Sequence, residues 1–266
     1  MQNIGKQKDK YVDLLDKIIE DADIIVQILD ARFPEETRNL AIEEKIKEKH
    51  KKIIYVFNKS DLIDKRKLKE YNYLTPSIAI SCKSYQNIKG LRDLIKRVSK
   101  NIKEPINKDG SGKIIVGIIG YPNTGKSSLI NSLIGKSSAG VGSDAGFTKG
   151  IQKLRLSEEI NLLDSPGVIP RIDYSSVNSE KIAQQVKLGG KSHSQVKEPE
   201  IVINELMKEY SKQIEKFYKI DSKGDTEILI EELGKRRRLL NKGGEVNGDK
   251  TARLILRDWQ EGRIKL

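Results

Sequence analysis

Residues 113–128 decide the fold, and they read KIIVGIIGYPNTGKSS. The first half is a continuous apolar run that predicts a buried strand. The second half, Gly120–Ser127, fits the pattern G-x-x-x-x-G-K-[ST], whose backbone N–H groups wrap round phosphate oxygens at the start of a helix. Because the motif stands between a strand and a helix, it predicts a P-loop NTPase. The expected phosphate-binding residues are Asn123, Thr124, Gly125, Lys126, Ser127 and Ser128.

A second motif, Asn58–Asp61 (NKSD), follows an apolar run at residues 52–57 that predicts another buried strand. The Asp61 carboxylate can accept hydrogen bonds from the ring N–H and the exocyclic amine of guanine together. Adenine would leave that carboxylate unpaired, so the motif favours guanine. We expect Lys59 to lie against the base and steady the phosphate loop, and Asn58 to bridge to neighbouring backbone. The residues after a third predicted strand at 77–80 complete the base site, and they are Ser81, Cys82 and Lys83.

The elements expected at the metal and the γ-phosphate come later in the chain. Asp164–Gly167 fits D-x-x-G at the end of a predicted strand, so Asp164 is expected to hold Mg²⁺ through water and Gly167 to contact the γ-phosphate. We expect the Ser127 hydroxyl to ligate the same ion. Thr148, in a glycine-containing loop, is the candidate for a threonine that closes on the metal.

The hydrophobic pattern predicts two domains. Strands at 23–29, 52–57, 77–80 and 113–119 alternate with helices at 10–21, 41–49, 91–100 and 126–135, which predicts an α/β domain with a mostly parallel sheet. Residues 151–156 and 160–163 are typical of a hairpin. Further helices are expected at 199–218, 225–240 and 249–260. We therefore predict an α/β domain over 1–172 and an all-helical domain over 173–266.

Composition narrows the class of protein further. The 266 residues include 50 Lys and Arg against 38 Asp and Glu, a net charge of +12, which favours an anionic partner such as nucleic acid. One cysteine and two histidines exclude a disulfide framework and argue against a cysteine-based zinc site. No apolar run approaches the roughly 20 residues of a membrane helix. We expect a cytoplasmic protein with no membrane partner.

The order of the motifs is unusual. The base-reading motif at Asn58 precedes the phosphate loop, which precedes Thr148 and Asp164, whereas a conventional GTPase begins with the phosphate loop. In this order the sequence resembles the circularly permuted, Ras-like GTPases of the YlqF/RbgA ribosome-assembly family. The resemblance extends to residues 29–32 (LDAR), 120–123 (GYPN) and 239–246 (LLNKGGEV). It implies a GTP-hydrolysing switch that uses GTP, GDP and Mg²⁺ and binds the large ribosomal subunit, or its precursor, and rRNA, with no DNA partner.

The catalytic group for hydrolysis is not evident. Val168 occupies the position after D-x-x-G where Ras-like enzymes carry a water-orienting glutamine, and valine cannot hydrogen-bond water. Some relatives are thought to use a histidine near the N-terminus, but this chain has none before His50, so that role is not carried over. Asn123 resembles the asparagine that allows related GTPases to bind K⁺ near the phosphates. The resemblance implies slow intrinsic turnover that ribosomal particles accelerate.

Two other functions remain open. A nucleotide-gated scaffold with negligible hydrolysis is compatible with Val168, whereas an ATP-dependent kinase or ATPase is disfavoured by the NKSD motif. For the helical domain, ten basic residues against four acids in 235–266 favour contact with RNA phosphates, although a solvated charged face would have the same pattern. The candidate RNA-binding residues are Arg236, Arg237, Arg238, Lys242, Arg253 and Arg257.

Overall fold

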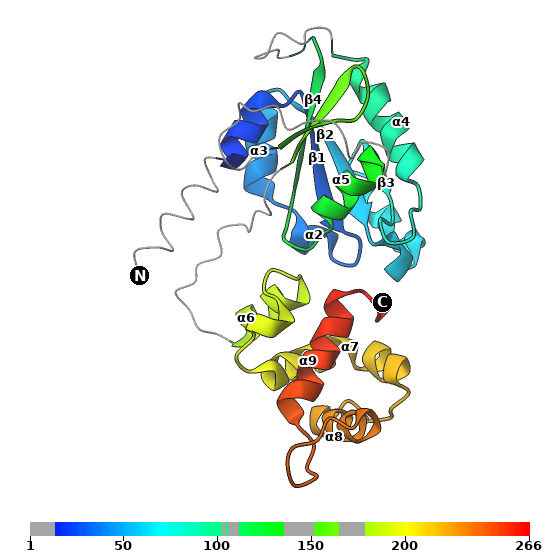
Figure 1. Cartoon of the computed structure of the whole chain (residues 1–266). Helices are drawn as coiled ribbons and strands as arrows, with labels where there is room; N and C mark the ends of the chain where they lie inside the picture. The colour runs from blue at the N-terminus through cyan, green and yellow to red at the C-terminus, as the bar shows by residue number, and fades with distance from the viewer. Residues whose placement is uncertain (1–13, 103–104, 106–111, 136–151, 165–178) are drawn as a thin grey trace, which may run out of the picture. The chain divides into compact units, whose positions relative to one another are not determined.

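The computed structural model describes residues 14–102, 105, 112–135, 152–164 and 179–266 (Figure 1). It divides the chain into two compact units, Met1–Pro170 and Arg171–Leu266, which are described separately here.

The first unit is built on a six-stranded sheet in the order β3-β2-β1-β4-β6-β5 (Figure 1). All neighbouring strands are parallel except β5 and β6, which form the predicted antiparallel hairpin. The α/β fold with a mostly parallel sheet is therefore confirmed. The strands are β1 (Ile24–Asp30), β2 (Lys52–Asn58), β3 (Ser77–Ala79), β4 (Ile114–Gly120), β5 (Gln152–Arg155) and β6 (Ile160–Asp164).

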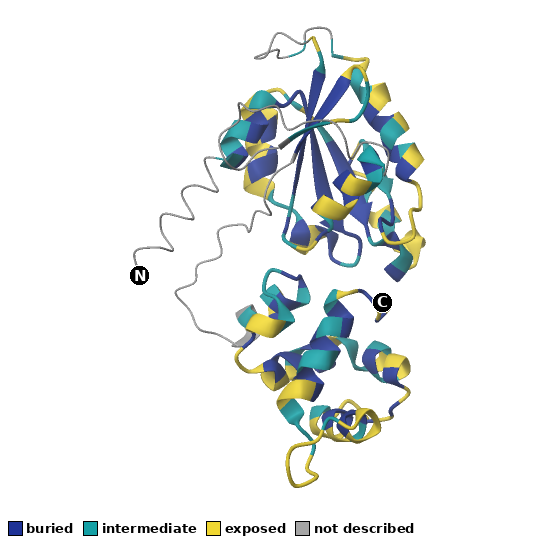
Figure 2. Ribbon diagram, in the orientation of Figure 1, coloured by how far each residue is buried: buried dark blue, intermediate teal, exposed yellow. Residues whose placement is uncertain are grey.

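Helices cover both faces of this sheet. The helical residues 14–21 and α3 (Leu40–Glu48) pack on one face, and α4 (Ile88–Ser99) and α5 (Lys126–Ile134) pack on the other (Figure 1). Strand β1 is buried at every position because its side chains alternate between these two layers. Figure 2 shows the buried strands between helices whose outer faces are exposed.

The connections diverge at the carboxyl ends of β1 and β4. After β1 the chain passes through α2 (Pro34–Thr37) to α3, whereas after β4 it passes to α5 on the opposite face. In open α/β sheets, ligands bind where neighbouring strands diverge in this way. The phosphate-loop motif begins at the last residue of β4, so the fold puts it at this position.

The described residues of the second unit are helical. They form α6 (Ser179–Lys187), α7 (Pro199–Tyr218), α8 (Thr226–Arg237) and α9 (Gly248–Gln260), with the short 3₁₀ helix η4 (His193–Gln195). Trp259 is fully buried at its centre, donates from Nε1 to the Lys187 carbonyl at 3.1 Å and packs on Tyr210.

Differences from the predicted elements are local. Helix α8 ends at Arg237 rather than at 240, because Arg238 adopts a left-handed φ of 55° and Leu240 then pairs with Val246 in a β-bridge. The 3₁₀ helices η1 (Ser60–Leu62) and η2 (Lys65–Tyr71) were not predicted. Across the residues described, no helix has the length and apolarity of a membrane span, and no cluster of three metal-ligating His, Cys, Asp or Glu side chains occurs.

The core makes a direct prediction for stability. Leu91 on α4 is completely buried, whereas Leu40 on α3 is 58% exposed. We expect Leu91→Ala to lower the free energy of unfolding by about 2–5 kcal/mol, because it removes buried methyl groups and leaves a cavity. The matched variant Leu40→Ala should change it by less than about 0.5 kcal/mol. Urea titration followed by circular dichroism measures both, and equal losses would contradict the assigned core.

Candidate nucleotide-binding site

The phosphate loop connects β4 to α5 in a conformation that requires glycine. Gly125 has a φ of +104°, and a Cβ added there would lie 2.2 Å from Nδ2 of Asn58. Asn123 also adopts a left-handed φ of 58°. Left-handed residues of this kind turn successive backbone N–H groups toward one side, which suits anion binding.

Lys126 is 7% exposed, although it carries a charge. Its ammonium donates to the backbone carbonyls of Gly120 and Tyr121, both at 2.9 Å. These two hydrogen bonds hold the Lys126 ammonium against the backbone of the phosphate loop. Ser127 and Ser128 are exposed in the first turn of α5, where the unpaired backbone N–H groups of a helix start are found.

Asn58, the last residue of β2, bridges two loops that are distant in sequence. Its Nδ2 donates to the Thr124 carbonyl at 2.7 Å, and its Oδ1 accepts from the Cys82 N–H at 3.1 Å. All three groups are buried. One side chain therefore ties the phosphate loop to the Ser81–Lys83 loop, as the expected backbone bridge requires.

Asp61 presents an acceptor next to this bridge. Among the residues that the structure describes, its Oδ1 is buried and has no hydrogen-bond partner. A buried carboxylate oxygen without a donor is costly, so it indicates a site that a ligand donor completes. The paired N–H groups on one edge of guanine are donors of the required kind.

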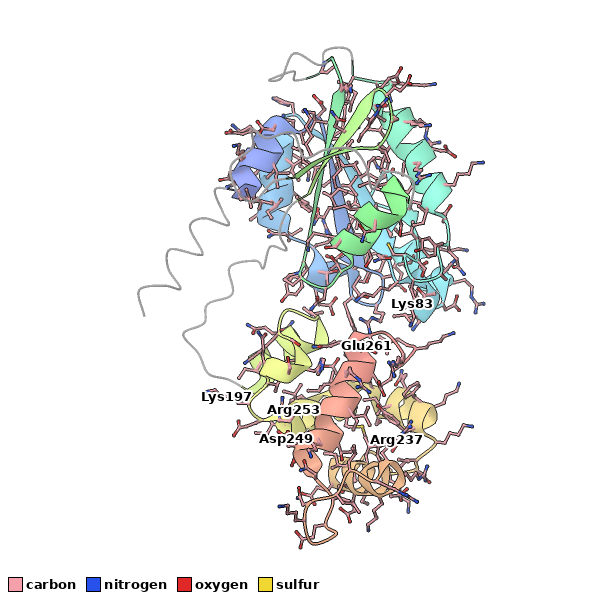
Figure 3. All side chains as sticks on the ribbon, viewed as in Figure 1. Lys83, Lys197, Arg237, Asp249, Arg253 and Glu261 are labelled. Carbon is pink, nitrogen blue, oxygen red and sulfur yellow. The ribbon has the colours of Figure 1, made fainter. Side chains whose placement is uncertain are left out.

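The Ser81–Lys83 loop lies beside the bridge. Ser81 is buried, with its backbone paired to Gln86, and its Oγ accepts from the Ser84 N–H at 3.2 Å. The Cys82 N–H donates to the Asn58 side chain. Burial raises the pKa of the Cys82 thiol to about 11, so it stays protonated at neutral pH. Lys83 is exposed (Figure 3).

The partner of Lys59 was missed from sequence. Its ammonium lies 2.8 Å from Oδ2 of Asp30, at the end of β1. Burial lowers the pKa of Lys59, and the Asp30 carboxylate opposes that shift. In the sequence Asp30 stands out only as part of the LDAR stretch. The signal that predicts its role is an acid at the end of β1, the strand that pairs with β4.

The metal-side residues are only partly described. Asp164 ends β6, with its backbone in register with Ile118 of β4, which places it at the same sheet edge as the phosphate loop. Thr148, Gly167 and Val168 lie outside the described residues. Their predicted roles, and those of Ser127 and Asp164 toward Mg²⁺, stay predictions.

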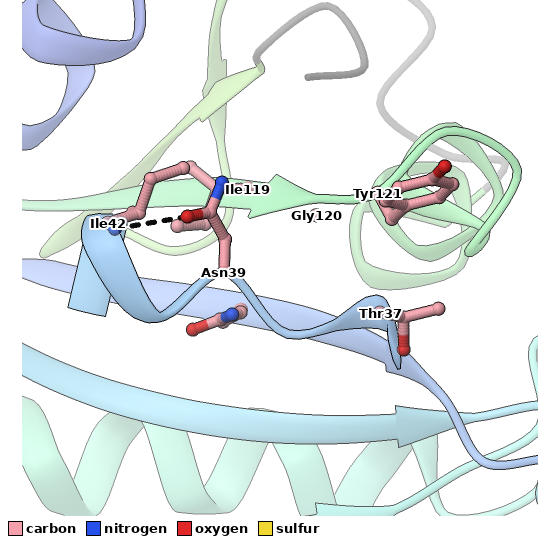
Figure 4. Close-up of a pocket in the computed structure, with 7 residues that line it drawn as sticks. Thr37, Asn39, Ile42, Ile119, Gly120 and Tyr121 are labelled. Atoms are coloured by element: carbon pink, nitrogen blue, oxygen red, sulfur yellow. Dashed lines mark hydrogen bonds between the residues drawn. The ribbon is translucent and has the colours of Figure 1, made fainter. Parts of the chain in front are cut away.

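A pocket on the α3 side of the loop is separate from the base-reading residues (Figure 4). Asn39 in its wall caps α3 by accepting from the Ile42 N–H at 3.2 Å. We assign this hollow to the packing of α3 against β4. Its lining residues are Gln27, Thr37, Asn39, Ile42, Ile119, Gly120 and Tyr121.

The candidate RNA-binding residues of the second unit separate into two groups. Arg237, Arg238 and Lys242 are exposed, and their side chains make no hydrogen bond or ion pair within the described part of the chain. Arg236 is also exposed, but it donates to the Lys219 carbonyl at 2.9 Å, at the end of α7.

Two other candidates lie on α9. Arg253 donates to the carbonyls of His193 and Val196, both at 2.9 Å, and pairs with Asp249 one turn earlier on α9 (Figure 3). Arg257 is half-exposed, with Nε 3.8 Å from Oδ1 of the buried Asp258. In this structure the Arg253 donors bond within the second unit, and its role toward RNA stays a prediction.

Comparisons with known proteins find a family and several GTP-binding proteins that this chain resembles. Residues 115–232 match the family described as 50S ribosome-binding GTPase. The chain is 38% identical over 259 residues to an uncharacterized GTP-binding protein of Methanocaldococcus jannaschii, covering 94% of this chain and 65% of that one. It is 34% identical to nucleolar GTP-binding protein 2 of Candida glabrata, covering 93% and 50%. The chain spans 46% to 65% of the length of such curated relatives.

The fold has a solved counterpart in GNP-bound YlqF from T. maritima. The two match with a TM-score of 0.66 and 21% sequence identity, over 96% of this chain and 94% of that one. The chain therefore has the fold of YlqF, and β2, which ends at the NKSD motif, comes before β4, which leads into the phosphate-loop motif.

The Asn58 bridge gives a prediction for this site. Asn58→Ala should lower the free energy of unfolding by about 2 kcal/mol or more, because it leaves the buried Cys82 N–H and Thr124 carbonyl unpaired. Hydrogen exchange at the Cys82 amide should accelerate as well. The control Asn131→Ala, at an exposed position on α5, should change neither. Unaltered exchange at Cys82 in the Asn58 variant would disprove the coupling of the two loops.

Proposed function

We propose that this protein binds GTP and GDP and hydrolyses GTP as a switch in the assembly of the large ribosomal subunit. One observation carries the nucleotide part of the proposal: Asn58, Asp61 and Lys126 gather at a single sheet edge, although they belong to motifs far apart in the chain. The family match and the names of the relatives support the ribosomal part.

In this proposal the base and the phosphates are bound by different elements. Asp61 reads the guanine edge, while Asn58, Lys59 and the Ser81–Lys83 loop hold the base. Phosphates bind to the N–H groups of residues 123–128 and to the Lys126 ammonium. The Mg²⁺ ligands are Ser127, Thr148 and Asp164, and Gly167 contacts the γ-phosphate. The ion would neutralise charge on the phosphates as the γ-phosphoryl group is transferred.

Hydrolysis in this account is slow without a partner. Val168 provides no hydrogen bond to the attacking water, so ribosomal particles are proposed to accelerate turnover. A K⁺ ion held with the help of Asn123 would add positive charge between the β- and γ-phosphates.

The helical unit, residues 173–266, is the proposed rRNA-binding domain. Its exposed basic residues Arg237, Arg238 and Lys242 cluster at the end of α8 and in the following turn, where guanidinium and ammonium groups reach RNA phosphates. The alternative, a nucleotide-gated scaffold with negligible hydrolysis, rests on Val168 and differs in lacking particle-stimulated turnover.

Base specificity tests the nucleotide part. Asp61→Asn replaces one acceptor by an amide donor, which clashes with the guanine amine but pairs with the carbonyl that xanthine carries there. We expect GDP affinity to fall at least about 100-fold and xanthosine diphosphate to become the preferred ligand. Isothermal titration calorimetry measures both affinities, and the control is Asp64→Asn, at the exposed N-cap of η2. Retained GDP preference in the Asp61 variant would refute the base assignment.

Salt-dependent binding tests the ribosomal part. Neutralising Arg237, Arg238 and Lys242 to glutamine should weaken co-sedimentation with large ribosomal subunits and reduce the slope of log affinity against log salt by about 2–3, roughly one unit per lost phosphate contact. The control neutralises Lys47, Lys67 and Lys69, which are exposed in the first unit. The GTP-analogue complex of the unaltered chain should bind more tightly than the GDP complex. Equal slopes for the two triple variants would count against this surface.

A further inference from the structure

Asp30 is a buried carboxylate whose acceptor positions are all used. It is 1% exposed at the end of β1. Oδ1 accepts from the Arg32 N–H at 3.1 Å and from its Nε at 3.0 Å, whereas Oδ2 accepts from Arg32 Nη2 and from Lys59 Nζ, both at 2.8 Å. A carboxylate has about four acceptor positions, so Asp30 has no freedom to rotate.

Arg32 determines where that carboxylate points. Its side chain is only 2% exposed, and its planar fork contacts both oxygens of Asp30. A fork of this kind fixes the plane of the carboxylate as well as its charge. The one remaining direction on Oδ2 leads to the Lys59 ammonium. The three groups therefore form a relay, from Arg32 through Asp30 to Lys59.

The relay lies where the nucleotide site is built. Asp30 is in register with Asn58 of β2, and the Ala31 N–H donates to the Asn58 carbonyl at 2.8 Å. On its other side, β1 pairs with β4 up to Gly120, where the phosphate loop begins. Lys59 itself has a left-handed φ of 62°. Non-glycine residues adopt that conformation at a cost, and functional sites are one place where that cost is tolerated.

A gain in folding stability does not by itself explain why three charged side chains are largely buried together here. Removing charges from water costs several kcal/mol per ion, and apolar replacements are often as stable. Burial would raise the pKa of Asp30, but Arg32 and Lys59 hold it well below its usual range. The carboxylate is therefore charged at neutral pH, and its contribution disappears only as the pH falls into the acid range.

We propose that Asp30, oriented by Arg32, is a positioning residue that fixes the Lys59 side chain for binding of the guanine nucleotide. The proposal rests on the proposed function, because it assigns Lys59 to the nucleotide. Without the Asp30 charge, the two cations would repel each other, and Lys59 would lose its place beside the base.

A double-mutant cycle on the full chain tests this relay. We expect Asp30→Asn and Lys59→Met each to raise the Kd for GDP about tenfold, since methionine keeps an apolar stem but loses the ammonium. The double variant should bind GDP within about twofold of Lys59→Met alone, because Asp30 acts only through Lys59. A purely structural role would lower affinity or stability by the same factor in both backgrounds.

Two further variants keep the test decisive. If Asp30→Asn does not fold, Arg32→Lys replaces it in the cycle, because lysine keeps the positive charge but lacks the planar fork. Alone, Arg32→Lys should weaken GDP binding severalfold. In the Lys59→Met background it should have no further effect. The control is Asp23→Asn, a buried carboxylate at the opposite end of β1 that accepts the Ile115 N–H at 2.8 Å. It should leave GDP affinity unchanged.

The outcomes separate this inference from the proposed function. Additive effects in the cycle, or an unchanged Kd in Asp30→Asn, would overturn the relay while GDP binding by the unaltered chain stood. Failure of the unaltered chain to prefer GDP over ADP would instead overturn the proposed function.

Discussion

The two hydrogen bonds of the Asn58 side chain hold the candidate site together. They join the Thr124 carbonyl in the phosphate loop to the Cys82 N–H in the loop after β3, and both partners are buried. The Cβ position of Gly125 is close to the same amide, so the loop cannot carry a larger residue there without displacing Asn58. Because buried amide groups need partners, these two bonds stabilise the observed arrangement of the three segments.

The sheet explains why the order of the motifs does not matter to the site. Parallel strands present their carboxyl ends at one edge, and β2, β1, β4 and β6 are neighbours in that sequence across the sheet. Residues 58–61, Asp30, the phosphate loop and Asp164 therefore lie at one edge of the sheet, whichever of them comes first in the chain. Permutation moves the ends of the chain and leaves the spatial order of the strands in place.

Much of this could be predicted from sequence because the patterns are local. Continuous apolar runs marked β1, β2 and β4 to within a residue or two, and two glycines with Lys126 marked the phosphate loop. The Asp30–Lys59 pair could not be predicted in that way, since it joins residues on separate strands and depends on register. Charge density in the sequence likewise does not reveal that the donors of Arg253 bond to backbone carbonyls of residues 193–196. The end of α8 could not be predicted because the left-handed residue that terminates it is Arg238, whereas the usual signal for such a position is a glycine.

The proposed function requires one pocket in which guanine lies at Asp61 and the phosphates lie at Lys126. The most direct measurement is a crystal structure of the full chain grown with GDP and Mg²⁺. It should show the Asp61 carboxylate within hydrogen-bond distance of the guanine ring N–H and exocyclic amine, with the β-phosphate enclosed by the N–H groups of Gly125, Lys126 and Ser127. A purine bound away from Asp61, or a diphosphate away from Lys126, would contradict it.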